Sequence, residues 1–346
     1  MGDLTLAVDI GGTKFAVGLV DAGGGVAESR VAATPPGGDA RALWETLTAL
    51  LDDLDVPDAV AGVGIGCGGP MTWPDGAVSP LNMPGWRGFP LRERLAARFP
   101  GVPVRIHNDA VCLAVAEHWR GAGRGVPNML GMVVSTGVGG GLILGGRLVD
   151  GGTGNAGHIG HVVVDPAGQP CGCGGRGCLE AIARGPGLAA WAVERGWSPA
   201  EEPREPATAT DTGPDTGPDT GPAPGGADGP KARYLEATAA SARRLAADAA
   251  AGHPIALEAM TRAGRALGTA IASAAALCDL DLVTIGGGLS QAGPLLFGPL
   301  EEALREHARI TFARRIRVVP AALGQEAGLV GAAALVVAPG SYWSAG

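Results

Sequence analysis

Residues 4–25 read LTLAVDIGGTKFAVGLVDAGGG, and this stretch decides the fold. An apolar, β-prone run at 4–10 stops at the turn Gly11-Gly12-Thr13-Lys14, and a second apolar run at 15–20 ends at another glycine cluster. Two such runs around a short turn predict a β-hairpin, and a third short strand is expected near 27–33. The Walker A pattern is absent. Because a strand and not a helix follows the turn, it is not the dinucleotide-binding fingerprint either.

The same pattern returns later in the chain. Residues 129–135 form an apolar run, residues 136–141 a glycine-rich turn, and residues 142–144 the next run. The two turns lie too far apart for a solenoid repeat, so we expect two related lobes that each open with a hairpin. Ordinary hairpin turns in a glycine-rich chain are the alternative.

Further strands are expected to alternate with helices, which predicts an α/β fold. The expected strands lie at 60–66, 102–106, 282–285 and 316–319. The expected helices lie at 40–54, 91–99, 110–119, 232–251, 254–278, 294–307 and 325–336.

The composition limits the possible functions. The chain has 346 residues, of which 46% are hydrophobic and 17% charged, so it can bury a large core in about two domains. Its net charge of −8 argues against non-specific binding of nucleic acid, which needs a basic surface. The N-terminus lacks the basic start of a secretion signal, and the longest apolar runs fall short of the ~20 residues of a membrane span. We therefore expect a cytoplasmic protein with no membrane partner.

Residues 198–230 have a different composition from the rest of the chain. Three copies of Asp-Thr-Gly-Pro lie between Asp211 and Pro222. Proline and glycine at this density cannot build a core, so we expect a disordered, low-complexity insertion at the surface.

The glycine-rich turns are candidate phosphate sites. Glycine lets successive backbone N–H groups approach the oxygens of a phosphate, and Thr13 and Lys14 add a hydroxyl and a cation. Asp9 could hold Mg²⁺, most simply through water. One such turn is weak evidence, but three together favour a nucleotide cleft between two lobes. The candidate nucleotide-binding residues are Asp9, Gly11, Gly12, Thr13, Lys14, Thr136, Gly137, Gly139, Gly140, Gly286 and Gly287.

A cysteine cluster predicts a metal site. His161, Cys171, Cys173 and Cys178 have the pattern His-x9-Cys-x-Cys-x4-Cys. Three thiolates and one imidazole complete a tetrahedral Zn²⁺ site with no open position, so one structural zinc is expected per chain. Three unligated cysteines are the alternative, and His158 is a rival ligand.

The pair Asn108-Asp109 follows an expected strand and opens an expected helix. An Asp in this place can be a catalytic base or a helix N-cap, and the residues alone leave both interpretations open.

These motifs together resemble a known family. Asp-x-Gly-Gly-Thr-Lys, Ser-Thr-Gly-x-Gly-Gly-Gly and Ile-Gly-Gly-Gly are similar to the phosphate and adenosine motifs of the ROK family of sugar kinases and related repressors. The resemblance runs from residue 4 to about residue 334 and implies the actin-like ATPase (ribonuclease-H-like) fold, with a nucleotide and sugar cleft between two lobes. It implies an N-terminal lobe at 1–120, joined by the C-terminal helix at 325–346, and a C-terminal lobe at 121–324.

The resemblance also implies roles on the sugar side. Asp109 corresponds to the base that accepts the sugar hydroxyl proton, and Asn108 to a sugar anchor. His161 and Glu180 match sugar contacts of the family, and the Cys3His spacing matches its zinc signature. His158 stands where the family has a Glu, which bears on the choice of sugar. The segments at 66–70, with Gly69, and at 82–86, with Trp86, resemble walls of the sugar pocket, although a packed core Trp is the alternative for Trp86.

The function that the resemblance implies is ATP–Mg²⁺-dependent phosphorylation of a hexose, with glucose as the first expectation. A kinase for fructose or an N-acetylhexosamine is the alternative within the class. A non-catalytic sugar-sensing regulator without a DNA-binding domain is the alternative outside it, and the acidic balance disfavours DNA. A homodimer or homotetramer is expected from the family.

Overall fold

The first five-stranded sheet contains the hairpin that opens the chain. The computed structural model describes residues 4–57, 59–198 and 242–343. The strands run in the order β3-β2-β1-β4-β7. Strand β1 pairs antiparallel with β2 and parallel with β4, which pairs parallel with β7. The predicted hairpin is therefore confirmed. The strands are β1 (Thr5–Ile10), β2 (Lys14–Val20), β3 (Val26–Ala33), β4 (Gly62–Cys67) and β7 (Val104–Asn108).

A second five-stranded sheet repeats this arrangement. Its order is β10-β9-β8-β11-β12, with an antiparallel pair β8–β9 and parallel pairs β8–β11 and β11–β12. The expectation of two related units that each open with a hairpin is confirmed at the level of strand pairing. The strands are β8 (Met129–Val134), β9 (Val138–Leu144), β10 (Arg147–Leu148), β11 (Leu282–Gly286) and β12 (Arg317–Pro320).

The predicted turn at 136–141 is too long. Strand β9 already begins at Val138, so Gly139 and Gly140 lie in the strand, paired with Val133 and Met132 of β8. The reason is packing against helix α3 (Asp109–Trp119), because a Cβ at Gly139 would lie 2.6 Å from the Cβ of Ala110. The glycines at this end of β9 therefore allow a close approach of helix and sheet.

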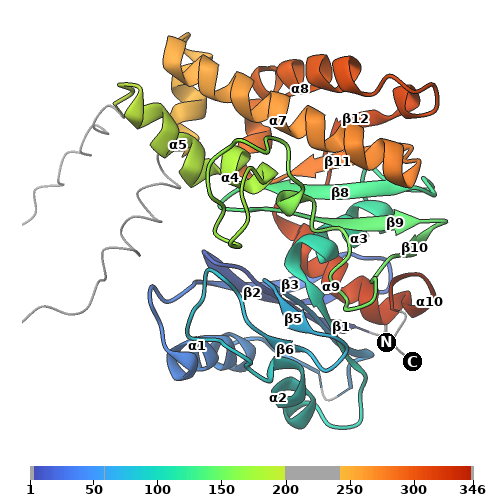
Figure 1. Cartoon of the computed structure of the whole chain (residues 1–346). Coiled ribbons are helices and arrows are strands. Elements are labelled where there is room, and N and C mark those ends of the chain that lie inside the picture. Colours follow the sequence, from blue (N-terminus) through green and yellow to red (C-terminus); the bar gives the residue numbers. More distant parts are fainter. Residues whose placement is uncertain (1–3, 58, 199–241, 344–346) are drawn as a thin grey trace, which may run out of the picture.

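Helices lie on both sides of the two sheets (Figure 1). Helices α3 and α9 (Ala327–Val337) run between the sheets, while α1 (Ala40–Asp52) and α2 (Leu91–Arg98) cover the outer face of the first sheet. On the outer side of the second sheet lie α4 (Leu179–Ala183), α5 (Gly185–Glu194), α7 (Pro254–Cys278) and α8 (Pro294–His307). The remaining elements are α10 (Pro339–Tyr342), β5 (Met71–Thr72), β6 (Ala77–Val78) and the 3₁₀ turns η1 (Ile159–His161), η2 (Gly288–Ala292), η3 (Ala313–Arg315) and η4 (Gly324–Glu326).

The predicted helices match these elements. Of the helix expected at 232–251, residues 242–250 are helical and the preceding part lies outside the described residues. The expected insertion at 198–230 lies outside them as well, apart from residue 198. No helix among the described residues combines the length and the apolar character needed to cross a bilayer.

Helix α9 ties the end of the chain to the first sheet. A Cβ at Gly64 of β4 would overlap the backbone of Ala332, and a Cβ at Gly331 would overlap the backbone of Cys112 in α3. Nearly every α9 side chain is buried as a result. The predicted C-terminal helix thus packs on the sheet that carries the turn between β1 and β2.

Candidate active site

The turn between β1 and β2 is closed by backbone hydrogen bonds. Gly11 N–H donates to the carbonyl of Lys14 at 3.0 Å, and the hydroxyl of Thr34 donates to the carbonyl of Gly11 at 2.8 Å. Thr13 is exposed, and its carbonyl accepts from the N–H of Thr34 at 3.1 Å. The side chain of Asn82 lies against Gly12, where a Cβ would overlap it. The segment at 82–86 therefore reaches the turn between β1 and β2.

Lys14 and Asp9 both face the beginning of α9. The ammonium of Lys14 donates to Oε1 of Gln325 at 2.7 Å. The carboxylate of Asp9 lies against Gly328, where any Cβ would overlap it. Only glycine lets the carboxylate come this close to the first turn of α9, where the helix dipole favours negative charge. The C-terminal part of the chain therefore packs against the turn between β1 and β2.

Two half-buried carboxyl groups influence each other in the site. Burial, and next the negative charge of Asp109, raise the pKa of Asp9 to about 7, although Lys14 acts in the opposite direction. Burial also raises the pKa of Asp109, against hydrogen bonds from the backbone N–H groups of Ala110 and of Asp109 itself. Two carboxylates in a poorly hydrated place favour a cation between or beside them. The carboxylate oxygens are ligands that suit Mg²⁺, so the residues present fit that ion.

Asn108 and Asp109 lie at the junction of β7 and α3. Oδ1 of Asn108 accepts from Ala110 N–H at 3.0 Å, which makes Asn108 the N-cap of α3. Asp109 is the first helical residue, and its Oδ1 accepts from the same N–H at 2.8 Å. The capping role that the sequence left open for Asp109 therefore belongs mainly to Asn108. The amide nitrogen of Asn108 lies beside Gly69, 3.1 Å from where a Cβ would stand.

His158 faces the same place from the second sheet. Its Nδ1 donates to the carbonyl of Asn155 at 2.9 Å, which leaves Nε2 as an acceptor in the neutral ring. Nε2 lies 3.9 Å from the Cβ position at Gly69. Burial lowers the pKa of His158, so the ring is held neutral at pH 7. Gly69, Asn108 and His158 therefore lie close together.

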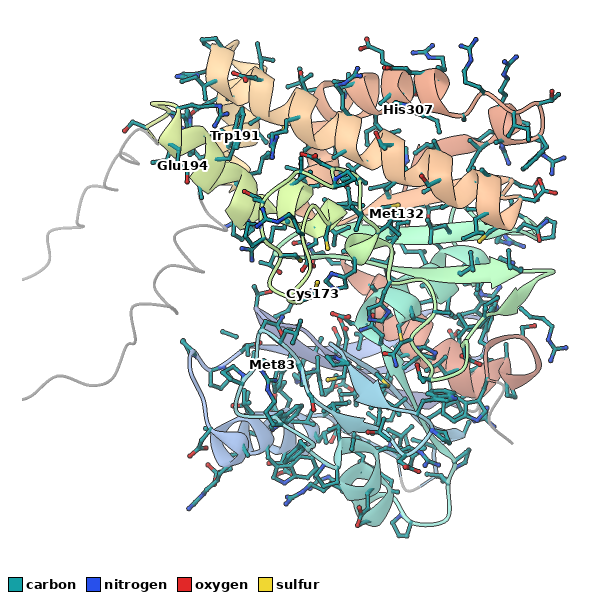
Figure 2. All side chains as sticks on the ribbon, viewed as in Figure 1. Met83, Met132, Cys173, Trp191, Glu194 and His307 are labelled. Atoms are coloured by element: carbon teal, nitrogen blue, oxygen red, sulfur yellow. The ribbon has the colours of Figure 1, made fainter. Side chains whose placement is uncertain are left out.

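The Cys3His cluster is assembled in space. The ligand atoms of His161, Cys171, Cys173 and Cys178 all lie within 4.8 Å of one another, and within the described residues His158 is not part of this group. Sγ of Cys171 lies 3.9 Å from Nδ1 of His161, and Sγ of Cys173 lies 3.8 Å from Sγ of Cys178. Figure 2 shows Cys173 on a loop between the two halves of the molecule. Burial, and then the neighbouring thiols, raise the pKa of Cys178 to about 12. Four converging N and S donors fit tetrahedral Zn²⁺, whose charge would offset thiolate repulsion.

Glu180 joins this loop to the second hairpin turn. It follows the last cysteine by two residues, and its Oε2 accepts from Val138 N–H at 2.9 Å. Gly137 lies so close to this carboxylate that a Cβ would stand 2.9 Å from Oε2. The cysteine loop, Glu180 and the turn before β9 are therefore one connected unit.

A small cavity lies beside this turn. Its volume is about 60 Å³, and it is lined by Ser135, Thr136, Gly185, Pro186, Ala242, Arg243, Gly288 and Leu289. Thr136 was predicted, and Gly286 and Gly287 lead directly into Gly288. At Gly287 the φ angle is +92°, and a Cβ would overlap the carbonyl of Val134, so this close approach requires glycine. Gly139 and Gly140 are in β9 and do not line the cavity.

Trp86 is a core residue. It is 0% exposed and stacks on Phe89 with ring centroids 4.4 Å apart and planes at 3°. Its indole N–H donates to the carbonyl of Ala40 at 3.3 Å. The core alternative for Trp86 is therefore correct, and this ring has no face free for a sugar.

A family model described as ROK family matches residues 5–338. The chain belongs to the ROK family. The glucokinase of Thermotoga maritima is 34% identical over 337 residues, which are 96% of each chain. The N-acetylmannosamine kinase of Escherichia fergusonii is 43% identical over 189 residues, 54% of this chain and 63% of that one.

A solved structure extends the likeness to three dimensions. The ROK family glucokinase from Streptomyces griseus, in complex with glucose and AMPPNP, has a TM-score of 0.74 and 31% identity, and the match covers 96% of this chain and 98% of that chain. The chain therefore has the two-lobed α/β fold of the ROK sugar kinases, and the predicted actin-like ATPase fold is confirmed.

Several residues that contact the candidate site were not predicted. Gln325 and Gly328 belong to the segment read only as a helix, and Arg243 follows the segment of unusual composition. Their signal is spatial, because the hydrogen bond from Lys14 to Gln325 spans 311 residues. The composition of Gly328-x-x-Gly331 is consistent with close packing but does not indicate what lies opposite.

Proposed function

We propose that this ROK-family protein transfers the γ-phosphoryl group of ATP to a hydroxyl of glucose. The observation that carries the proposal is the pair of interacting carboxyl groups, Asp109 at the start of α3 and Asp9 at the end of β1, beside a phosphate turn. Full-length similarity to two glucokinases supports glucose as the acceptor.

In this proposal Asp109 is the general base. It accepts the proton of the sugar hydroxyl as that oxygen attacks phosphorus. Its raised pKa brings its basicity closer to neutral pH, where a base is most effective. The transition state of phosphoryl transfer is loose, so positioning and charge neutralisation contribute most of the rate.

The nucleotide is held by backbone and side chains from both sheets. The residues at 11–14 bind phosphate oxygens, with Lys14 adding positive charge, and Asp9 holds Mg²⁺ through water. The cavity at Thr136, Gly185 and Gly288 takes the adenosine part. When bound, Mg²⁺ supplies charge neutralisation of the phosphates.

The sugar lies among Gly69, Asn108, Asp109, His158 and Glu180. Asn108 offers an amide donor, whereas His158 offers a single neutral acceptor where a carboxylate would offer two oxygens. One structural Zn²⁺ in the Cys3His cluster fixes the loop that carries His161 and Glu180, and we keep the expectation that the protein is a homodimer or homotetramer.

N-acetylmannosamine is a second candidate acceptor. The N-acetylmannosamine kinase relative has the higher identity over about half of the chain. The neutral His158 side chain also accepts fewer hydrogen bonds from sugar hydroxyls than a carboxylate does. This fits a sugar in which one hydroxyl is replaced by another substituent.

A coupled assay of ADP release over a panel of sugars tests the proposal. We expect glucose to give the highest kcat/KM, followed by mannose or N-acetylmannosamine. If no sugar stimulates ADP release, the kinase proposal is wrong. If N-acetylmannosamine exceeds glucose, the second candidate replaces the first.

A further inference from the structure

A buried hydrogen-bond chain links the two halves of the molecule behind the sugar site. His107, the residue before Asn108, is 0% exposed, and its Nε2 lies 2.9 Å from Oδ1 of Asp150, which is 7% exposed. On the other side of the ring, Nδ1 lies 2.8 Å from the backbone nitrogen of Asn108. The chain therefore runs from the Asp150 carboxylate through the imidazole to the backbone of the sugar-binding pair.

The geometry fixes the tautomer of His107. The backbone N–H of Asn108 can only donate, so Nδ1 must accept and carries no proton. Nε2 then carries the proton, and this N–H donates a hydrogen bond to Oδ1 of Asp150. A carboxylate that orients an imidazole in this way fixes both its tautomer and the plane of its ring.

The two ends of the chain belong to different sheets. His107 is in β7, the edge strand of the first sheet, whereas Asp150 follows β10, the edge strand of the second. Asp150 begins the segment 150–158, which leads to His158, and its carbonyl accepts from Ala156 N–H at 3.0 Å. Asp150 thus holds the segment at its first residue through its side chain, and a backbone hydrogen bond from Ala156 folds the segment back onto this residue.

Aromatic packing supports the same arrangement. The ring of Trp73 lies 4.9 Å from that of His107, tilted by 43°. Gly154, in the segment after Asp150, lies over Trp73, because a Cβ there would stand 2.5 Å from Trp73 Cβ. The segment 150–158 therefore rests on the same buried unit that holds the start of α3.

We propose that His107 and Asp150 are a pair of positioning residues that hold segment 150–158, with His158, in register with Asn108 and Asp109. The two sugar-facing groups come from opposite sheets, and this buried pair joins the backbones that carry them. Neither residue touches the sugar. The proposal rests on the proposed sugar-kinase function, and its effect is on sugar binding and turnover, not on the nucleotide.

Four variants test the two hydrogen bonds of His107 separately. Asp150→Ala removes the acceptor, and Asp150→Asn keeps an oxygen that can accept from Nε2–H. His107→Asn places an oxygen near the Nδ1 position and loses the reach to Asp150. His107→Gln places an amide near Nε2 and loses the acceptor for Asn108 N–H. Tyr342→Phe is the matched control, because it removes a hydrogen bond of 2.7 Å to another histidine, His118, at the far end of α3.

We expect Asp150→Ala, His107→Asn and His107→Gln each to raise the KM for glucose about tenfold and to lower kcat about tenfold, with the KM for ATP within about twofold of the wild type. Asp150→Asn should restore both values to within about threefold. Tyr342→Phe should lower the melting temperature without changing either KM.

Calorimetric titration with glucose alone gives a readout independent of turnover, with the same tenfold loss expected in Kd. The proposal is overturned if His107→Asn binds and turns over glucose like the wild type, or if Asp150→Asn loses about tenfold in both values like the other variants. Both criteria compare a variant with the wild type, so they hold even if Asp150→Ala fails to fold. If the wild type itself shows no sugar-stimulated ADP release, the proposed function fails instead, and the titration data show whether sugar binding survives.

Discussion

The turn between β1 and β2 carries its own charges, Asp9 before it and Lys14 at its end, whereas the matching turn between β8 and β9 carries none. The second turn takes a carboxylate from Glu180, which bonds Val138 N–H at 2.9 Å from 42 residues away. Both turns lie at the same place in a repeated strand pattern. Equivalent positions in the strand pattern therefore carry different chemistry.

The difference suggests separate duties for the two turns. A charged turn next to Asp109 suits Mg²⁺ and the phosphates that react. A neutral turn beside a small cavity suits the rest of the nucleotide, and the hydrogen bond of this turn to Glu180 makes it sensitive to the cysteine loop. The predictions below test these two duties.

Removing the charge of Asp9 should have the largest effect. We expect Asp9→Asn to lower kcat by about 10²–10³-fold, because the Mg²⁺-binding carboxylate is lost. The ligand-free variant should also be more stable than the wild type at about pH 8, by up to about 4 kcal/mol. The folded protein raises the pKa of Asp9 from 3.8 to about 7, so ionised Asp9 destabilises the fold above pH 4, and fully so above pH 7.

Thermal melts with and without Mg²⁺–ATP measure the stability of Asp9→Asn relative to the wild type, and an activity assay measures its kcat. The matched control is Asp21→Asn, because Asp21 lies at the next turn of the same sheet and its carboxylate accepts from Gly25 N–H. It should leave kcat unchanged. An active Asp9→Asn variant, or one less stable at pH 8 than the wild type, would contradict the role given to the first turn.

Disrupting the cysteine loop should also impair the turn between β8 and β9. We expect Cys173→Ser to lose about one zinc per chain and several kcal/mol of stability, and to raise the KM for both glucose and ATP, since Glu180 connects the loop to the turn. Cys278→Ser, outside the cluster, is the control. Metal analysis and melting curves of both variants and the wild type test this prediction. If the wild type contains no metal and is as stable without zinc as with it, the zinc assignment is wrong.

The carboxyl groups of the first turn predict an acidic limb in the pH profile. Both raised pKa values mean that protonation removes the active form as the pH falls, so kcat/KM for ATP should decrease below about pH 7. A higher Mg²⁺ concentration should move the limb to lower pH, because the ion competes with the proton on Asp9. A profile that is flat down to about pH 5 would argue that these groups do not titrate in the reaction.

The smallest effect separates packing from phosphate binding in β9. We expect Gly139→Ala to cost about 1–3 kcal/mol of stability, because the new Cβ meets Ala110, and to change the KM for ATP less than twofold. Gly152→Ala is the control: a Cβ there meets open space, so this variant should change neither the stability nor the KM for ATP. A large rise in the KM for ATP with unchanged stability would indicate instead that Gly139 binds the nucleotide.

Local sequence signals account for much of this fold. Helix α7 begins and ends where predicted, with Pro254 in its first turn and left-handed Asp279 after its end. The Cys3His cluster was also predicted, because its spacing is short. The second turn was misjudged because glycines suggest a loop, while the close approach of α3 that requires them is tertiary. His107–Asp150 and Lys14–Gln325 had no local signal, since the partners meet only in space.

The central claim is that Asp109 removes the proton from the sugar hydroxyl. The most direct measurement is glucose-dependent ADP formation by Asp109→Asn at saturating glucose and ATP, with glucose binding measured on the same sample. The account predicts a loss of kcat of about 10²–10⁴-fold with a glucose Kd within about threefold of the wild type. Turnover at the wild-type rate would contradict it.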